Sequence, residues 1–99
     1  MAKEIIWSPR SEITFYSILN YLKENWSEKE VENFILSTVT VINYIAEHPQ
    51  MFRKTNKPNV REALVTPQNL LVYKVFPEKI VLIAFYDTRQ NPRKKPLKI

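Results

Sequence analysis

The sequence predicts a small α+β domain, in which an N-terminal strand and an antiparallel helix hairpin pack on a small antiparallel β-sheet. Apolar residues recur at the spacing of one helix face through the first half of the chain, whereas the second half reads as short strands separated by turns. A chain of 99 residues, 44% of them hydrophobic, is long enough for one modest core. We therefore expect residues 1–99 to form a single domain.

A short strand over residues 3–7 opens the predicted fold, and the first helix follows it directly. Ser8 is placed to cap that helix, and Pro9 suits its first turn because its ring presets the backbone angle there. The apolar spacing predicts a single buried face made of Phe15, Ile18, Leu19 and Leu22.

The start of the second helix is marked by the stretch WSEKEV, residues 26–31. Ser27 and Glu30 have the spacing of a capping box. Trp26 and Val31 occupy the two positions of a hydrophobic staple. A helix is therefore expected to begin at this point.

The second helix is predicted to stop after His48, because Pro49 follows it. Only residues 24–26 link the two helices, so they should form an antiparallel hairpin. His48 is more easily explained by the helix dipole than by acid-base catalysis. The predicted buried face consists of Val31, Phe34, Ile35, Thr38, Ile42 and Ile45.

The sheet is predicted from the change of pattern after a cationic loop at residues 53–59. Residues 61–66 and 70–76 read as two strands joined by a turn, and residues 80–87 as a third, which together make an antiparallel meander. The apolar run 80–86 is unbroken. This favours a central strand covered by the helices on one side and by a partner or a concave surface on the other.

Composition excludes several kinds of chemistry. The chain has no cysteine, which excludes disulfides and thiolate metal sites, and no glycine, which excludes a glycine-rich phosphate loop. Its lone histidine makes no metal site. No apolar stretch is long enough to span a membrane. We expect a cytoplasmic protein with no cofactor, no metal and no membrane contact.

The charge is distributed unevenly along the chain. Residues 1–48 carry four Lys or Arg against seven acids, whereas residues 49–99 carry eleven against three and end in a basic tail over about 90–99. Such asymmetry suggests a face that meets phosphates or an acidic partner, although a charge run is usually a solvated surface. The two acid-free cationic groups are Arg53, Lys54, Lys57 and Arg61, and Arg93, Lys94, Lys95 and Lys98.

Three further side chains are candidates for a binding surface. Arg89 follows the last strand beside Asp87, so it either closes the strand end as an ion pair or binds a phosphate or target. Tyr73 and Tyr86 lie on predicted strands and are able to stack on bases, although core packing is the commoner role for at least one of them.

The order of these segments resembles the RelE/ParE superfamily of bacterial toxins. The resemblance covers nearly the whole chain and rests on IIWSPRSE, YLKENWSEKEVENF, the HP pair at 48–49, LLVYKV and FYDTRQNP. It implies a toxin of a type II toxin-antitoxin system, of the kind that serves in plasmid stabilisation, held inactive by a cognate antitoxin. RelE-like members cleave mRNA on the ribosome, and ParE-like members inhibit DNA gyrase.

The residues present favour the ParE-like mechanism. RNA cleavage needs a group to remove the 2′-hydroxyl proton and cations to stabilise the phosphate. Leu70 stands where the resemblance implies a catalytic Arg, and Arg61 and Ala63 stand at two expected lysine positions. No tyrosine follows Arg89, whereas the T-R-Q-N stretch is closer to ParE-like members.

The expectation is therefore a toxin that binds and inhibits gyrase without being an enzyme. The first alternative is a ribosome-dependent mRNA endoribonuclease with Lys54, Lys57, Arg61 and Arg89 as its catalytic cations, and the second is a non-toxic nucleic-acid-binding member. An exposed final strand would also invite a homodimer or a toxin-antitoxin hetero-oligomer. The expected binding surface comprises Arg53, Lys54, Lys57, Arg61, Tyr73, Arg89, Arg93 and Lys94.

Overall fold

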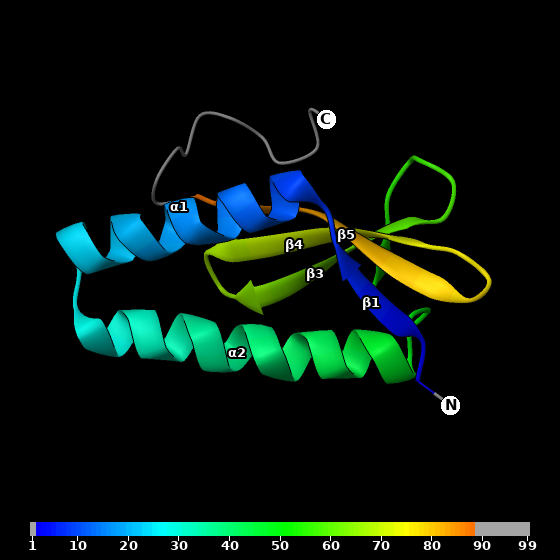
Figure 1. The fold of residues 1–99 in the computed structure, drawn as a ribbon, viewed down its shortest axis with the longest axis horizontal. Coiled ribbons are helices and arrows are strands. Elements are labelled where there is room, and N and C mark those ends of the chain that lie inside the picture. Colours follow the sequence, from blue (N-terminus) through cyan, green and yellow to red (C-terminus); the bar gives the residue numbers. More distant parts are fainter. Residues whose placement is uncertain (1, 89–99) are drawn as a thin grey trace.

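The protein folds into two layers, a helix hairpin on one face of a five-stranded β-sheet (Figure 1). The structure is a computed structural model and describes residues 2–88. It confirms the predicted α+β architecture. The elements are β1 (Glu4–Trp7), α1 (Pro9–Asn25), α2 (Glu28–Glu47), β2 (Arg53–Lys54), β3 (Val60–Thr66), β4 (Asn69–Val75) and β5 (Lys79–Asp87).

Both predicted helix starts are confirmed by their caps. The Ser8 hydroxyl oxygen accepts a hydrogen bond from the N–H of Ser11 at 3.0 Å, and Pro9 is the first residue of α1. At α2, the Ser27 hydroxyl accepts from the N–H of Glu30 at 3.3 Å. Each cap satisfies a backbone donor that the first helical turn leaves without a partner.

The core lies between the hairpin and the facing side of the sheet. Its helical part is Ile18, Leu22, Phe34 and Ile45, all of which are buried as expected. The prediction for Ile35 was wrong, because that side chain is 38% exposed. Ile35 follows Phe34 and so lies about 100° further round the helix, past the edge of the buried stripe.

The sheet has the order β1-β5-β4-β3-β2, so the final strand is not an edge. β1 pairs with β5 in parallel and the remaining pairs are antiparallel, which makes the sheet mixed instead of wholly antiparallel. The prediction that the unbroken apolar run 80–86 forms a central strand is confirmed, since β5 has neighbours on both sides. In a meander of β3, β4 and β5 alone, one edge of β5 would have no partner strand. The N-terminal strand β1 pairs with that edge.

The helix α1 covers the part of β5 that β1 is too short to reach. β1 ends at Trp7, opposite Leu82. Beyond that point the Ser8 hydroxyl donates to the carbonyl of Ile83 at 3.1 Å, and the Thr14 hydroxyl accepts from the N–H of Phe85 at 2.9 Å. Side chains of α1 and its cap thus continue the hydrogen bonding that a longer edge strand would provide.

The two faces of the sheet differ in what they carry. Ala63, Leu71 and Phe85 face the helices in the core. The opposite side, which we call the second sheet face, is identified by strand pairing and alternation. It carries Val60, Glu62 and Leu64 from β3, Leu70, Val72 and Lys74 from β4, and Val81, Ala84 and Tyr86 from β5.

Candidate functional site

Three of the predicted cations line one cavity of about 470 Å³ beside the loop that follows β2. We call it the loop cavity, and its charged lining is Lys54, Lys57 and Arg61. Gln50, Thr55, Asn56 and Asn59 add polar groups, and no acidic side chain of residues 2–88 lines it. An arrangement of this kind suits an anionic ligand. The structure therefore brings together three of the four cations of the first predicted group.

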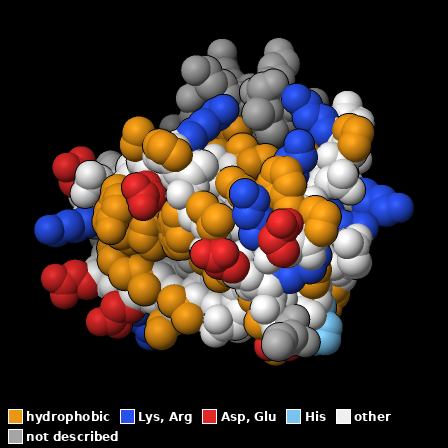
Figure 2. All heavy atoms as spheres, turned by 45° about the vertical axis from the view of Figure 1, so that its right-hand side comes forward, with side chains coloured by type: hydrophobic (Ala, Val, Ile, Leu, Met, Phe, Trp, Pro, Cys, Tyr) orange, Lys and Arg blue, Asp and Glu red, His pale blue; other side chains and the backbone are white. Residues whose placement is uncertain are grey.

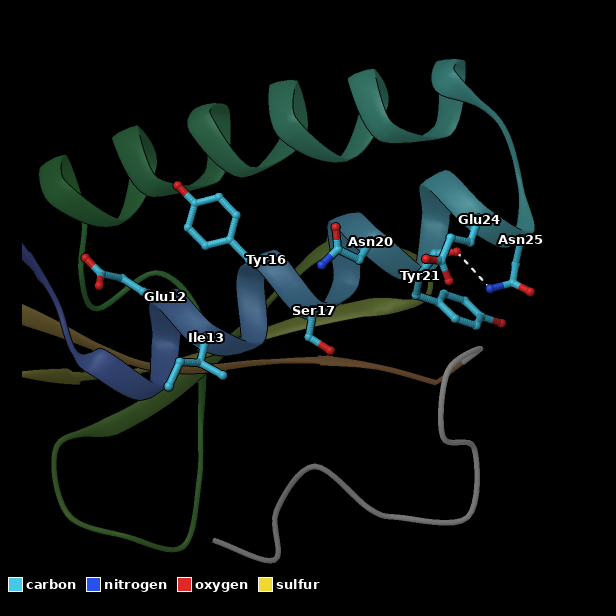
Figure 3. A pocket seen from close by; sticks show the side chains of 8 residues that line it. All are labelled: Glu12, Ile13, Tyr16, Ser17, Asn20, Tyr21, Glu24 and Asn25. Atoms are coloured by element: carbon cyan, nitrogen blue, oxygen red, sulfur yellow. Dashed lines mark hydrogen bonds between the residues drawn. The ribbon is translucent and has the colours of Figure 1, made fainter.

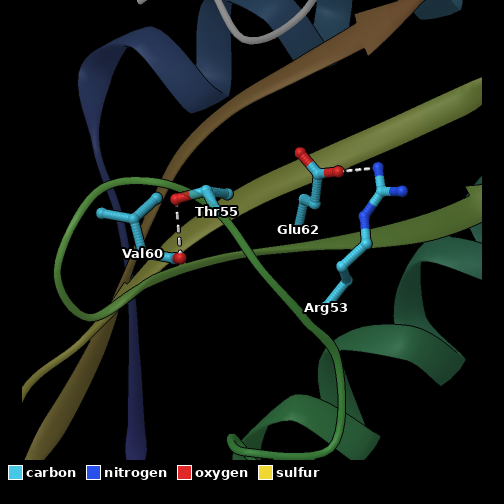
Figure 4. Close-up of polar contacts among 4 residues, drawn as sticks. All are labelled: Arg53, Thr55, Val60 and Glu62. Carbon is cyan, nitrogen blue, oxygen red and sulfur yellow. Dashed lines mark hydrogen bonds and ion pairs between the residues drawn. The ribbon is translucent and has the colours of Figure 1, made fainter.

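The loop around this cavity is held by its own hydrogen bonds. The Thr55 hydroxyl donates to the carbonyl of Val60 at 2.9 Å (Figure 4) and accepts from the N–H of Lys57 at 3.1 Å. Asn59 has a positive φ of 63°, a conformation that asparagine tolerates better than most residues. Its carbonyl accepts from the N–H of Val75 at 2.8 Å, which ties the loop to β4.

Arg61, which lines the loop cavity, also forms hydrogen bonds that stabilise the neighbouring backbone. Its Nη1 donates to the carbonyls of Gln50 and Phe52 at 3.1 and 2.7 Å, and its Nη2 donates to the Gln50 side-chain oxygen at 2.5 Å. These bonds fasten the segment between α2 and β2 to β3. Arg61 therefore contributes charge to the cavity while its donors hold the backbone.

Arg53 lies apart from the other three, on the second sheet face. It pairs across the strands with Glu62 and forms an ion pair with its carboxylate (Figure 4). The Glu62 side chain is 2% exposed and that of Arg53 is 74% exposed. The acid-free group expected from the sequence is thus split, because β2 is a strand where a loop was predicted and its pairing brings an acid to Arg53.

Tyr73 does not belong to the expected binding surface, and its role is the core packing that was expected for at least one of the two strand tyrosines. Its side chain is fully buried, and its hydroxyl donates to the carbonyl of Pro49 at 2.9 Å. Burial raises the pKa of Tyr73 from 10.0 to about 12, and the nearby charge of Arg61 lowers it in part. A buried phenol of this kind stabilises the core and is not accessible to a base.

Tyr86 is the tyrosine that stays accessible, on the second sheet face. Its hydroxyl accepts a hydrogen bond from Arg10 at 3.1 Å, and the Arg10 guanidinium carbon lies 5.9 Å from the ring centroid. Arg10 was not predicted as a site residue. One feature of the sequence indicated that Arg10 is unusual: it is a cation in the first turn of α1, where acidic residues are favoured.

The predicted site residues of the C-terminal tail, Arg89, Arg93 and Lys94, lie outside the described residues. The neighbouring carboxylate of Asp87 is 6% exposed and accepts a hydrogen bond from the Asn69 side chain at 2.6 Å.

A second candidate surface lies on the hairpin. A groove of about 290 Å³ between α1 and α2 is lined mainly by apolar side chains, among them Phe15, Ile35 and Val39, with Glu12 at its border. We call it the hairpin groove. Figure 2 shows hydrophobic side chains exposed in a broad patch with acidic ones beside it. On the two helices, the most exposed large apolar side chains are Ile13 at 68%, Leu36 at 67% and Tyr16 at 61%.

The outer surface of α1 extends this apolar region. A shallow depression of about 680 Å³ runs along the helix from Glu12 to Asn25 and includes Tyr16 and Tyr21 (Figure 3). Glu12 and Glu24 give it an acidic border. The hairpin thus presents apolar surface with negative charge, whereas the loop cavity is cationic.

Two other properties bear on the class of protein. Among residues 2–88, no three His, Asp or Glu side chains are grouped so that they could hold a metal ion. No helix in that part of the chain is long and apolar enough to cross a membrane.

The order of a strand, a helix hairpin and a short sheet whose last strand lies beside the first is also found in solved structures of toxin-antitoxin proteins. The P. aeruginosa chromosomal ParDE TA system contains a chain of this fold, with a TM-score of 0.73 at 10% identity over 87% of this chain and 96% of that one. The YoeB dimer from Staphylococcus aureus has a TM-score of 0.60 at 14% identity, and the match covers 87% of this chain and 97% of that one. A chain of the E. coli DinJ-YafQ toxin-antitoxin complex has a TM-score of 0.61 at 9% identity, and the match covers 92% of this chain and 98% of that one.

The chain matches no established sequence family and no curated protein sequence. The resemblance in fold to these proteins, which the sequence predicts, is confirmed by the comparisons with solved structures.

Proposed function

We propose that this protein is the toxin of a type II toxin-antitoxin pair. The observation that carries the proposal is the fold, which is similar over most of both chains to proteins of ParDE, YoeB and DinJ-YafQ. The uneven charge supports it, because a cationic cavity and an apolar, acidic hairpin provide separate surfaces for a target and a neutralising partner. Its targets would place it in the cytoplasm.

The mechanism we propose is ParE-like, the binding and inhibition of DNA gyrase. The residues expected for RNA cleavage are replaced or occupied. Ala63 is buried in the core, Leu70 is apolar, and the donors of Arg61 are used by backbone carbonyls. These facts favour an inhibitor that acts by binding.

We propose that the cognate antitoxin binds in the hairpin groove. The groove is apolar with an acidic border, so it suits an amphipathic segment that carries basic residues. Leu36 and Val39 are exposed on α2, at 67% and 53%, and suit the apolar face of such a segment. Leu36→Asp and Val39→Asp should weaken antitoxin rescue and leave growth arrest intact, and Lys29→Asp at the start of α2 is the matched control.

The experiment that tests the mechanism is induction of this chain alone in a bacterial host, followed by growth measurement and transcriptome-wide mapping of new 5′ ends. Growth arrest without new cuts, together with loss of supercoiling by purified gyrase, is expected. New cuts at in-frame codon positions would contradict the gyrase assignment and establish an mRNA endoribonuclease.

That alternative has one specific observation in its favour. Lys54 and Lys57 lie with Arg61 around the loop cavity, which suits RNA phosphates, and YoeB and YafQ have the same fold. In this case Arg89 is the remaining expected catalytic cation. A third candidate, a non-toxic nucleic-acid-binding protein, predicts normal growth on induction with salt-dependent binding to nucleic acid.

A further inference from the structure

Two cations face each other across the paired strands β2 and β3. Lys54 is the direct cross-strand partner of Arg61, and both side chains line the loop cavity. Like charges at directly opposite positions destabilise a sheet. The neighbouring pair is of the favourable kind, because Arg53 stands opposite Glu62 and forms an ion pair with it. The pair of Lys54 and Arg61 therefore carries a repulsion that an anion held between the two side chains would relieve.

A third cation, Lys57, lines the same cavity from the loop that joins β2 to β3. No acidic side chain of residues 2–88 lines the cavity. Within that part of the chain, the ammonium groups of Lys54 and Lys57 have no hydrogen-bond or ion-pair partner. Three cations around one cavity create a positive potential that attracts anions. The charge that balances them has to come from solution.

Neutral donors complete the lining of the cavity. The side-chain oxygen of Gln50 accepts a hydrogen bond from Arg61, which leaves the amide nitrogen of Gln50 able to donate. Asn56 and Asn59 also line the cavity with amide side chains. Phosphate oxygens accept hydrogen bonds from lysine, arginine and amide side chains alike. The lining therefore suits an anion that offers several phosphate oxygens.

The loop has its shape without a ligand. Thr55 donates to the carbonyl of Val60 (Figure 4) and accepts from the N–H of Lys57, and the carbonyl of Asn59 accepts from the N–H of Val75. A loop that its own hydrogen bonds already order loses little conformational entropy when a ligand binds. The three cations are therefore held around a preformed cavity.

The size and charge of the cavity decide which phosphate compound fits. A volume of about 470 Å³ lies in the range of small-molecule pockets. A nucleic-acid strand carries a single charge on each phosphate, spread along its length. Condensed phosphates place more charge on directly linked groups, which matches three cations gathered around one small volume.

We propose that the loop cavity binds a free condensed phosphate, namely a pyrophosphate or triphosphate group. Lys54 and Arg61 hold it from the two strands, and Lys57 holds it from the loop. Because Arg61 also donates to the carbonyls of Gln50 and Phe52, the bound anion stabilises the segment between α2 and β2. This site is separate from the second sheet face, and it depends neither on toxicity nor on the gyrase assignment.

The test is a calorimetric titration of the whole chain with pyrophosphate at low salt, together with thermal unfolding. Bound pyrophosphate should raise the unfolding midpoint, because a ligand that binds only the folded state stabilises it. Potassium chloride at the same ionic strength should raise the midpoint much less. Equal rises with the two salts, or no heat of binding, would overturn the proposal.

The variant Lys57→Gln should weaken pyrophosphate binding by about tenfold, because a charge-assisted hydrogen bond is lost. Lys29→Gln removes the same charge at the start of α2, the end of the helix remote from Gln50, and should leave the affinity unchanged. Equal losses in the two variants would show that only the net charge matters and would contradict the site.

A single-stranded oligouridylate without terminal phosphates separates the free anion from a nucleic-acid phosphate. At equal phosphate concentration it is expected to leave bound pyrophosphate in place, because its charge is less concentrated. If the oligomer displaces pyrophosphate from the wild-type chain, and Lys57→Gln weakens the oligomer as well, the cavity is a nucleic-acid contact and the proposal is wrong.

Discussion

The hydroxyl of Thr14 accepts a hydrogen bond from the backbone N–H of Phe85 at 2.9 Å and donates one to the carbonyl of Arg10 at 2.8 Å. A helix side chain thus pairs with a strand amide where the neighbouring strand has ended. Phe85 is buried and packs on Trp7 and Phe15, with ring centroids 5.5 and 5.3 Å away. The single hydroxyl therefore fixes β5 against the aromatic part of the core.

Replacing Thr14 by Val should destabilise the protein by roughly 1 to 3 kcal/mol, because the shape is kept while the N–H of Phe85 loses its acceptor. Denaturant unfolding measures the change. Thr14→Ser keeps the hydroxyl and should cost much less. If both variants unfold at the same denaturant concentration, the hydrogen bond contributes nothing.

Replacing Arg61 by Met should release the segment between α2 and β2, since three hydrogen bonds to Gln50 and Phe52 are lost. We expect faster amide exchange across residues 49–54 and a loss of roughly 1 to 3 kcal/mol. Lys54→Met removes the same charge from an exposed position and should leave exchange unchanged. Similar effects in both variants would show that charge alone matters.

Stability should fall in alkali because of Tyr73. Its pKa is raised by burial to about 12 in the folded protein against 10.0 in an unfolded chain. Its contribution is therefore fully present below pH 10.0 and is lost as the pH rises towards about 12, where the unfolded state has released its proton first. Unfolding measured across this range should show the decline, and Tyr73→Phe should flatten it. An unchanged slope in the variant would contradict the assignment.

The pair of Arg53 and Glu62 should show coupling in a double-mutant cycle. Arg53→Gln leaves the buried carboxylate without its cation and should destabilise by roughly 1 to 3 kcal/mol. The same change in a Glu62→Gln background should cost little, because no buried charge remains. Additive losses measured by denaturant unfolding would mean that the two side chains do not interact.

Growth arrest should depend on Arg89 and Arg93 if the ParE-like proposal is right. Arg89→Ala with Arg93→Ala is expected to abolish arrest, whereas Lys54→Ala with Lys57→Ala should leave it largely intact. The measurement is viable count after induction, with protein abundance followed by immunoblot. The opposite result would favour the endoribonuclease, and arrest that survives in both pairs would remove these four cations from the mechanism.

Local signals in the sequence predicted the two helices and the antiparallel meander of β3, β4 and β5. Ser8 with Pro9, and Ser27 with Glu30, act within a few residues, so their geometry depends little on the rest of the fold. The buried face of α1 was predicted from the spacing of its apolar residues alone. Ile35 was misassigned because the width of a buried stripe depends on how the sheet lies beneath it.

The candidate site was less predictable, because a strand places neighbouring residues on opposite faces. Arg61 faces the helices and the loop cavity, whereas Glu62 faces the other way with Arg53. No local signal reveals that β2 exists, since its two residues become a strand only through pairing with β3. Glu62 had one signal, an acid within the strand VREALVT.

The parallel pairing of β1 with β5 has a consequence for folding kinetics. Glu4 and Lys79 are partners although nearly the whole described chain separates them, so this pairing requires closure of a very large loop. The helix hairpin and the β3-β4 hairpin involve contacts close in sequence and should form first. Docking of β1 then becomes the late step, and a chain caught before it exposes the edge of β5 to any strand-forming partner.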